Sequence, residues 1–246
     1  MKKVSTKGFT LVELLVVIGI LGILMGALFP AITSAMLSAN TSACSMRGRN
    51  LYVGIVAANT EREGAGLGNV WPRAGGKDEG ADQEDIASKT FGTSTEYFRE
   101  LFDLDNFGKE NWSPYLSGVD IGVLSGSGVP GMTGSTLEDK NVTWTVAANV
   151  QDEMEDVVPV LFTRNVSKDQ LKTDEYDGQS TTEVKVGKAN GAAYDTPFSN
   201  KAWVLVRKGG ASQVIKAKYS RLNVIYNRQS FKIPQTDNQF QYLEPK

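Results

Sequence analysis

The 246-residue chain contains no histidine and only one cysteine, Cys44. Without an imidazole the chain cannot build a Ser-His-Asp triad, a Cys-His pair or a histidine-ligated zinc or haem site. A single thiol likewise excludes an internal disulfide and any CxxC metal or redox motif. An enzyme with this composition could still use carboxylate, lysine or tyrosine chemistry, or a metal bound by oxygen ligands. These absences favour a structural or binding role over an enzymatic one.

Charge is almost absent from the N-terminal part of the chain. From Phe9 to Met46 the only charged residue is Glu13, and Leu14–Ile32 forms 19 consecutive residues without charge. A helix rises about 1.5 Å per residue, so this stretch reaches roughly 28 Å, close to the thickness of a hydrocarbon core. Three lysines precede it: Lys2, Lys3 and Lys7. This basic flank favours a cytoplasmic amino end for a membrane-spanning helix.

Two kinds of membrane segment share this pattern, a removed secretory signal and a retained anchor. A removed signal would be cleaved after small residues, for which the candidates are Ala35, Ala39 and Ala43. A disposable signal gains nothing from Glu13, because a carboxylate in an apolar segment costs roughly 2.5 to 3.5 kcal/mol. The apolar run is also longer than the core of about 7 to 15 residues in a signal. Both observations favour a retained anchor.

The start of this segment carries a family resemblance. Its residues 7–14 are Lys7-Gly8-Phe9-Thr10-Leu11-Val12-Glu13-Leu14. This run resembles the leader-peptide junction of type IV pilins and of the pseudopilins of type II secretion systems. The resemblance implies that a membrane-embedded prepilin peptidase cuts between Gly8 and Phe9 and then N-methylates Phe9. A residue without a side chain before the cut lets the backbone extend into a narrow protease site.

Glu13 is the candidate residue for assembly and register. Cleavage would create an ammonium group on Phe9, four positions before Glu13 and on the same face of the helix. The resemblance implies that Glu13 instead pairs with Phe9 of a neighbouring subunit. A buried carboxylate that meets its charge partner only in the filament would penalise wrong registers. The alternative is a carboxylate that snorkels at the membrane edge.

Two glycines and one proline mark the apolar helix. Gly22 and Gly26 have the GxxxG spacing that lets helices approach closely, although glycine is also common in membrane helices for no specific reason. Pro30 lacks the donor for an intrahelical bond and is expected to kink or loosen the helix around Gly26 to Pro30. The resemblance supports this interpretation, because many pilins carry a helix-kinking proline at this distance from the junction.

Three segments are expected along the chain: a leader at 1–8, a membrane and polymerisation helix at 9–62, and a globular head at 63–246. The helix is expected from Phe9 to about Thr60, with glycines after it. Its apolar positions beyond the membrane segment form a stripe that would face the head: Leu37, Cys44, Leu51, Ile55 and Ala58. Cys44 on that stripe is interpreted as a small buried apolar residue.

The head is expected to consist mainly of short strands. Ser94 or Thr95 would cap a short helix that continues to about Leu104. Strand-like runs follow at Val142–Val150, Val157–Arg164, Thr182–Val186, Ala202–Val206, Gln213–Ala217 and Leu222–Tyr226. Lys208-Gly209-Gly210 lies between two of them and indicates a hairpin. One long helix followed by strands predicts an α+β fold with the helix packed on an antiparallel sheet, which is also the pilin architecture.

Two acidic clusters in the head are weak calcium candidates. The first contains Asp152, Glu153, Glu155 and Asp156, and the second contains Asp174, Glu175 and Asp177. Oxygen-rich loops can hold calcium, and the resemblance implies such a site in some pseudopilins. Neither cluster has EF-hand spacing, so solvated loops are the main expectation and no cofactor is predicted. Gly126–Gly131 matches GxGxxG, but no helix is expected after it to hold a pyrophosphate, so a loop is predicted.

Charge is unevenly distributed in the head. The stretch from Lys201 to Lys232 contains eight basic and no acidic residues, whereas Glu138 to Asp177 contains ten acidic and four basic ones. Aromatic residues interleave with the basic ones: Trp203, Tyr219, Tyr226 and Phe231. This pattern is compatible with two structures: a surface that binds single-stranded DNA, and an ordinary half-buried sheet. A basic face that meets an acidic face of the next subunit fits head-to-tail polymerisation better.

The resemblance predicts a structural subunit, a pilin or pseudopilin, rather than an enzyme. The precursor would be a single-pass inner-membrane protein with a cytoplasmic N-terminus, and the filament would be periplasmic or on the cell surface. Implied partners are copies of the chain and other pilins, prepilin peptidase, an inner-membrane platform protein, an assembly ATPase, a secretin and membrane lipid. The alternatives are a minor pilin that acts as an adhesin or DNA-binding module, and a membrane-anchored or secreted carboxylate-based enzyme.

Overall fold

The structure is a computed structural model. It describes residues 9–75, 85–104, 115–133, 136–187, 196–234, 236 and 238–246. The chain divides into two compact units, Met1–Ala39 and Asn40–Lys246. One helix, α1 (Leu11–Gly64), contributes its first part to the N-terminal unit and its remainder to the second unit, which is the head.

The helix α1 has 54 residues and continues through Pro30. The helix begins two residues after Phe9, its predicted start, and ends four residues after Thr60, its predicted approximate end. A Schellman motif closes its last turn, in which Gly66 adopts a left-handed φ of 73°. The Gly66 N–H donates to Glu63 O at 3.0 Å, and the Leu67 N–H donates to Arg62 O at 2.9 Å. The predicted glycine stop is confirmed, with Gly66 as the residue that turns the chain.

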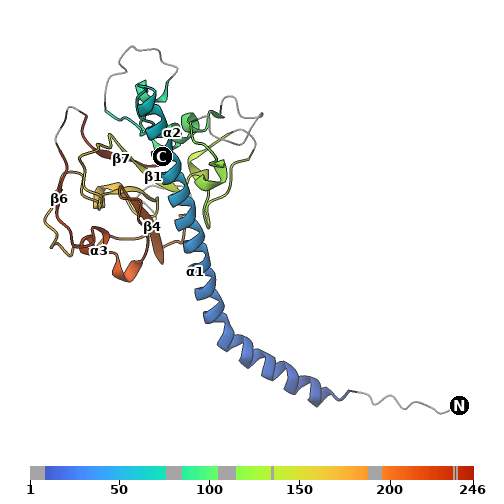
Figure 1. The fold of residues 1–246 in the computed structure, drawn as a ribbon. Coiled ribbons are helices and arrows are strands. Elements are labelled where there is room, and N and C mark those ends of the chain that lie inside the picture. Colours follow the sequence, from blue (N-terminus) through green and yellow to red (C-terminus); the bar gives the residue numbers. More distant parts are fainter. Residues whose placement is uncertain are drawn as a thin grey trace. The chain divides into compact units, whose positions relative to one another are not determined.

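The head is built on a five-stranded sheet with the order β5-β4-β2-β1-β7, in which all neighbours are antiparallel. Figure 1 labels β4, β1 and β7 of this sheet. Its strands are β1 (Trp144–Ala148), β2 (Pro159–Thr163), β4 (Ala202–Arg207), β5 (Ser212–Lys216) and β7 (Gln241–Leu243). The predicted hairpin is confirmed, because β4 and β5 pair with Val204 opposite Val214. The predicted α+β architecture, a long apolar helix followed by an antiparallel sheet, is therefore confirmed.

Two predicted strands are wrong. Leu222–Tyr226 forms a short helix, α3 (Leu222–Ile225), whose buried residues Leu222 and Ile225 are three positions apart. Thr182–Val186 contributes only one isolated bridge, between Glu183 and Arg221. A tertiary contact explains α3, because the Arg207 guanidinium on β4 donates to Ile225 O at 2.7 Å. A cation at the carboxyl end of a helix satisfies carbonyl groups that have no partner within the helix.

Shorter elements complete the head. α2 (Ser94–Leu101) is capped by Thr93 rather than by Ser94 or Thr95, and Thr93 and Glu96 form a capping box. A separate two-stranded sheet, which the sequence did not predict, pairs β3 (Glu175–Tyr176) with β6 (Phe231–Lys232). Short 3₁₀ turns lie at Ile86–Ser88, Ile121–Leu124, Asp139–Asn141, Lys168–Gln170 and Ala217–Tyr219.

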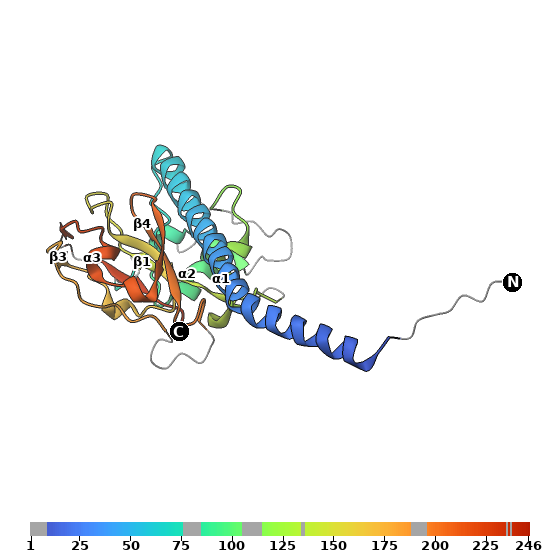
Figure 2. The same cartoon turned by 90° about the horizontal axis from the view of Figure 1, so that it is seen from below.

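Helices cover both faces of the five-stranded sheet. The part of α1 that belongs to the head lies on one face, and α3 lies on the other (Figure 2). On the α1 side Gly48 is so close to Trp144 that a Cβ at position 48 would lie 2.5 Å from the ring. On the opposite side Phe162 contacts Trp203 and Tyr242 edge to face. The three central strands are buried along their whole length, which explains their nearly continuous apolar sequences.

The apolar stripe of α1 within the head is confirmed. Cys44, Leu51, Ile55 and Ala58 are buried, whereas Leu37 lies in the N-terminal unit and is half-buried. Burial raises the pKa of the Cys44 thiol to about 12. A thiol with so high a pKa behaves as a small apolar core residue, since the reactive form is the thiolate.

Candidate functional site

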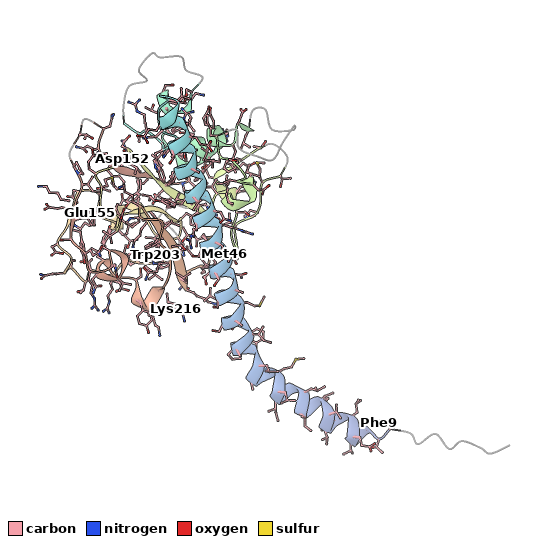
Figure 3. The ribbon with its side chains drawn as sticks, viewed as in Figure 1. Phe9, Met46, Asp152, Glu155, Trp203 and Lys216 are labelled. Carbon is pink, nitrogen blue, oxygen red and sulfur yellow. The ribbon has the colours of Figure 1, made fainter. Side chains whose placement is uncertain are left out.

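The predicted processing site lies at the beginning of the described chain. Gly8 and the three lysines before it fall outside the described residues. Phe9 lies two residues before Leu11, the first residue of α1, and its side chain is 71% exposed (Figure 3). A side chain with this exposure is accessible to a second molecule.

Glu13 closes the first turn of α1 together with Thr10. The N–H and the hydroxyl of Thr10 each donate to the Glu13 carboxylate at 2.8 Å. The Glu13 N–H donates in return to the Thr10 hydroxyl at 3.3 Å. This is a capping box, and it places the carboxylate at the positive end of the helix dipole. The prediction missed Thr10, although the Thr-x-x-Glu spacing is itself the signature of such a box.

The apolar segment of α1 exposes large side chains all around the helix. Every large hydrophobic residue from Leu11 to Met36 is at least 46% exposed. Among the described residues, α1 is the one helix long and apolar enough to cross a membrane. A helix that is apolar on all sides needs lipid or other helices around it.

The glycines of this segment have no packing role within the N-terminal unit. A Cβ built at Gly22 or Gly26 would have no atom within 4 Å. At Pro30 the helix continues, and the Thr33 hydroxyl donates to Pro30 O at 3.0 Å. The roles of the two glycines in helix packing and of Pro30 in loosening the helix stay predictions.

The second acidic cluster lines a groove of about 810 Å³ in the head. Asp174 and Glu175 are exposed there. The carboxylate of Asp177 accepts the N–H groups of Ser180 and Gln179 at 3.0 and 2.9 Å, which lower its pKa. In the part of the chain that the structure describes, no three acidic side chains converge as metal ligands. Calcium at either cluster stays the alternative to the expected solvated loop.

The first acidic cluster lies on a loop, residues 152–156, which we call the acidic loop; its four acidic residues are exposed and Met154 is buried. It is attached to the turn of the β4–β5 hairpin through its backbone. The Lys208 ammonium donates to the carbonyl groups of Asp152 and Met154, both at 2.7 Å. The Gly209 N–H donates to Asp156 O at 3.0 Å. These bonds use the carbonyl groups and leave the carboxylates of the loop at the surface.

The aromatic residues of the basic segment do not form a stacking platform for nucleic acid. Trp203, Tyr226 and Phe231 are buried, and of the four only Tyr219 is exposed, by 55%. Base stacking requires exposed rings, so this sequence pattern belongs to a half-buried sheet and its neighbours.

The glycine-rich match at Gly126–Gly131 begins with a tight turn. The Val129 N–H donates to Gly126 O at 3.0 Å, and Gly128 has a φ of 81°. The expected loop is confirmed in this part, and no phosphate-binding helix starts at the turn.

Comparison with known families identifies the N-terminal segment. Residues 4–29 match the model of the prokaryotic N-terminal methylation motif. They form a prepilin segment like that of type IV pilins and pseudopilins, and the whole chain has a pilin-like α+β architecture. Searches of curated proteins and of solved structures gave no match. The motif and the fold indicate a structural protein, and together with the apolar helix they fit a membrane-anchored precursor.

Proposed function

We propose that this protein is the structural subunit of a type IV filament, either a surface pilus or a type II secretion pseudopilus. The observation that carries the proposal is the apolar first part of α1, which exposes large side chains all around while containing one charge, Glu13. Lipid covers this surface in the precursor, and neighbouring copies of the same helix cover it in the filament. Close helix packing replaces lipid contacts where small residues such as Gly22 and Gly26 allow the approach.

Processing converts the precursor into a subunit that can assemble. Prepilin peptidase removes residues 1–8 by cutting between Gly8 and Phe9, and then N-methylates Phe9. Residues 9–62 act as the anchor and polymerisation helix, with Pro30 as the point where the helix loosens, and residues 63–246 act as the head.

The new ammonium group on Phe9 provides the charge partner for Glu13 of a neighbouring subunit. In the single subunit the Thr10 hydroxyl and N–H already hold the Glu13 carboxylate near the amino end of α1. A subunit added in a wrong register would leave both charges unpaired in apolar surroundings, which is costly.

The remaining partners follow from this role. The precursor resides in the inner membrane with its N-terminus in the cytoplasm, and the filament forms in the periplasm or on the cell surface. Assembly requires an inner-membrane platform protein, an assembly ATPase and, for export, a secretin.

Mass spectrometry of the N-terminal peptide from the native protein tests the processing step. We expect a mature chain that begins with N-methylated Phe9. A mature terminus between Ala35 and Ala43 would instead identify a conventional secretory signal and refute the proposal.

Glu13→Ala tests the assembly step, with Glu61→Ala as a matched control because Glu61 is an exposed carboxylate near the other end of the same helix. We expect both variants to be cleaved normally, and only Glu13→Ala to lose filaments, as measured in sheared fractions and by electron microscopy. Filaments at wild-type yield from Glu13→Ala would contradict the charge pairing.

A further inference from the structure

One end of the β4–β5 hairpin carries a net positive charge. Four cations gather there on exposed positions, and we call them the basic end: Lys201, Lys216, Lys218 and Arg221. Ala202 pairs with Lys216 where the hairpin opens, so Lys201 lies next to this pair. The Lys218 ammonium lies 4.6 Å from the ring centre of Tyr219 and lowers the pKa of that phenol. None of the four makes an ion pair with a carboxylate of the described residues. Glu183 is opposite Arg221 in an isolated bridge, and its single charge leaves the group with a net positive charge.

The other end of the same hairpin carries a net negative charge. The acidic loop holds four exposed carboxylates: Asp152, Glu153, Glu155 and Asp156. The cation next to them, Lys208, donates to the carbonyl groups of Asp152 and Met154, and its single charge leaves the loop with a net negative charge. No ion pair among the described residues involves any of the four carboxylates.

The two charged groups are too far apart to neutralise each other within one head. About five strand residues separate the hairpin turn from the open end, which corresponds to roughly 17 Å at 3.3 Å per residue. Figure 3 shows Asp152 and Glu155 on one side of the head and Lys216 on the other. Exposed charges separated by more than about 8 to 10 Å are largely screened at physiological salt.

We infer that the acidic loop of one subunit docks on the basic end of the next copy of the same chain. This inference rests on the proposed function, because it requires copies that assemble in a row. The two surfaces are complementary in sign, and they lie on different parts of one subunit. Such a heterologous contact leaves one surface of each subunit free for the next copy, so its repetition produces a row of heads wherever the rotation does not close a ring. Lys208 positions the acidic loop for this contact through the backbone.

Charge reversal in the full-length protein tests the contact in cells that carry the assembly machinery. One variant combines Glu153→Lys with Glu155→Lys, and a second combines Lys216→Glu with Lys218→Glu. All four residues are exposed, so we expect the unfolding temperature of each variant to match that of the wild type. Like charges facing each other across an interface are strongly unfavourable, so each variant is expected to lose about tenfold or more of the filament yield. The chain that carries all four reversals is expected to recover the yield.

The matched control changes two acids elsewhere on the head. Asp174→Lys with Glu175→Lys alters the net charge as much as reversal of the acidic loop does, but in the groove of the second acidic cluster. We expect its filament yield to stay close to that of the wild type. An equal loss in this control, or no recovery in the fourfold variant, would overturn the inference.

Disulfide trapping gives a second readout that does not depend on yield. A chain with Glu155→Cys and Lys216→Cys should form ladders of linked subunits in oxidised filaments, because a disulfide joins residues whose Cα atoms are within about 7 Å. The native Cys44 is 1% exposed and stays out of the reaction. Each single substitution should give no ladder beyond a dimer. Wild-type cells without filaments would refute the proposed function itself, whereas normal filaments without ladders and without a charge effect would refute only this contact.

Discussion

The contact between Gly48 and Trp144 predicts how the long helix is held on the sheet. A Cβ at position 48 would lie 2.5, 3.0 and 3.1 Å from three carbon atoms of the Trp144 ring. The ring has little freedom to move, because Trp144 is fully buried and its Nε1 donates to Val123 O at 2.7 Å. Gly48→Ala should therefore destabilise the head although alanine is the better helix former.

The expected magnitude is a difference of two effects. Replacing glycine by alanine inside a helix stabilises it by about 1 kcal/mol. Forcing an extra methyl group into a close-packed contact costs about 1 to 3 kcal/mol. We expect a net loss of up to about 2 kcal/mol, or a fall in the unfolding temperature of up to about 8 °C for a domain of this size. Ala57→Gly lies at an exposed position of the same helix and measures the effect of helix propensity alone. It should lower the free energy of unfolding by about 1 kcal/mol.

Thermal unfolding of the full chain in detergent, followed by near-ultraviolet circular dichroism, measures these effects. Gly48→Ala combined with Trp144→Phe provides a double-mutant cycle, because the smaller ring makes room for the methyl group. The cycle should show a favourable coupling between the two substitutions. If Gly48→Ala stabilises the protein as much as Ala57→Gly destabilises it, and the cycle shows no coupling, the close contact does not exist.

Two further predictions concern the anchor and the core. Gly22→Leu should leave unfolding of the head and membrane insertion unchanged, because nothing within the N-terminal unit lies near this position, but it should reduce filament yield, whereas the control Met25→Leu should not. The Cys44 thiol has a pKa of about 12 when folded and about 9 when unfolded, so the unfolded chain loses this proton first as the pH rises. The free energy of unfolding should fall above pH 9 by up to about 1.4 kcal/mol per pH unit, and Cys44→Ala should have a shallower pH dependence in denaturant titrations between pH 8 and 11. An identical pH dependence in both proteins would refute the assigned environment of the thiol.

The central strands were predictable because their apolar runs are bounded by turn residues. The predicted bounds of β1, β2, β4 and β5 differ from the observed ones by at most two residues at either end. The strand β7 was missed because its three residues, Gln241–Leu243, form a strand only through pairing with β1. Local pattern also misled the prediction at Leu222–Tyr226, where three apolar residues fit a strand and a helical turn equally well. The Arg207 guanidinium on the distant strand β4 donates a hydrogen bond to the end of α3 and thereby favours the helical turn.

The sequence by itself determined the N-terminal segment of this protein. An apolar segment with one carboxylate, a basic flank and a cleavage-like junction depend on neighbouring residues, and the Thr10–Glu13 box closes within three positions. The tertiary structure decided what depends on distant parts of the chain. It placed the acidic loop and the basic end at opposite ends of one hairpin, buried three aromatic residues that could have met a nucleic acid, and set Gly48 against Trp144. Hydrophobic patterns and helix caps act between neighbouring residues of a chain, whereas contacts between distant segments and the separation of charges exist only after the chain has folded.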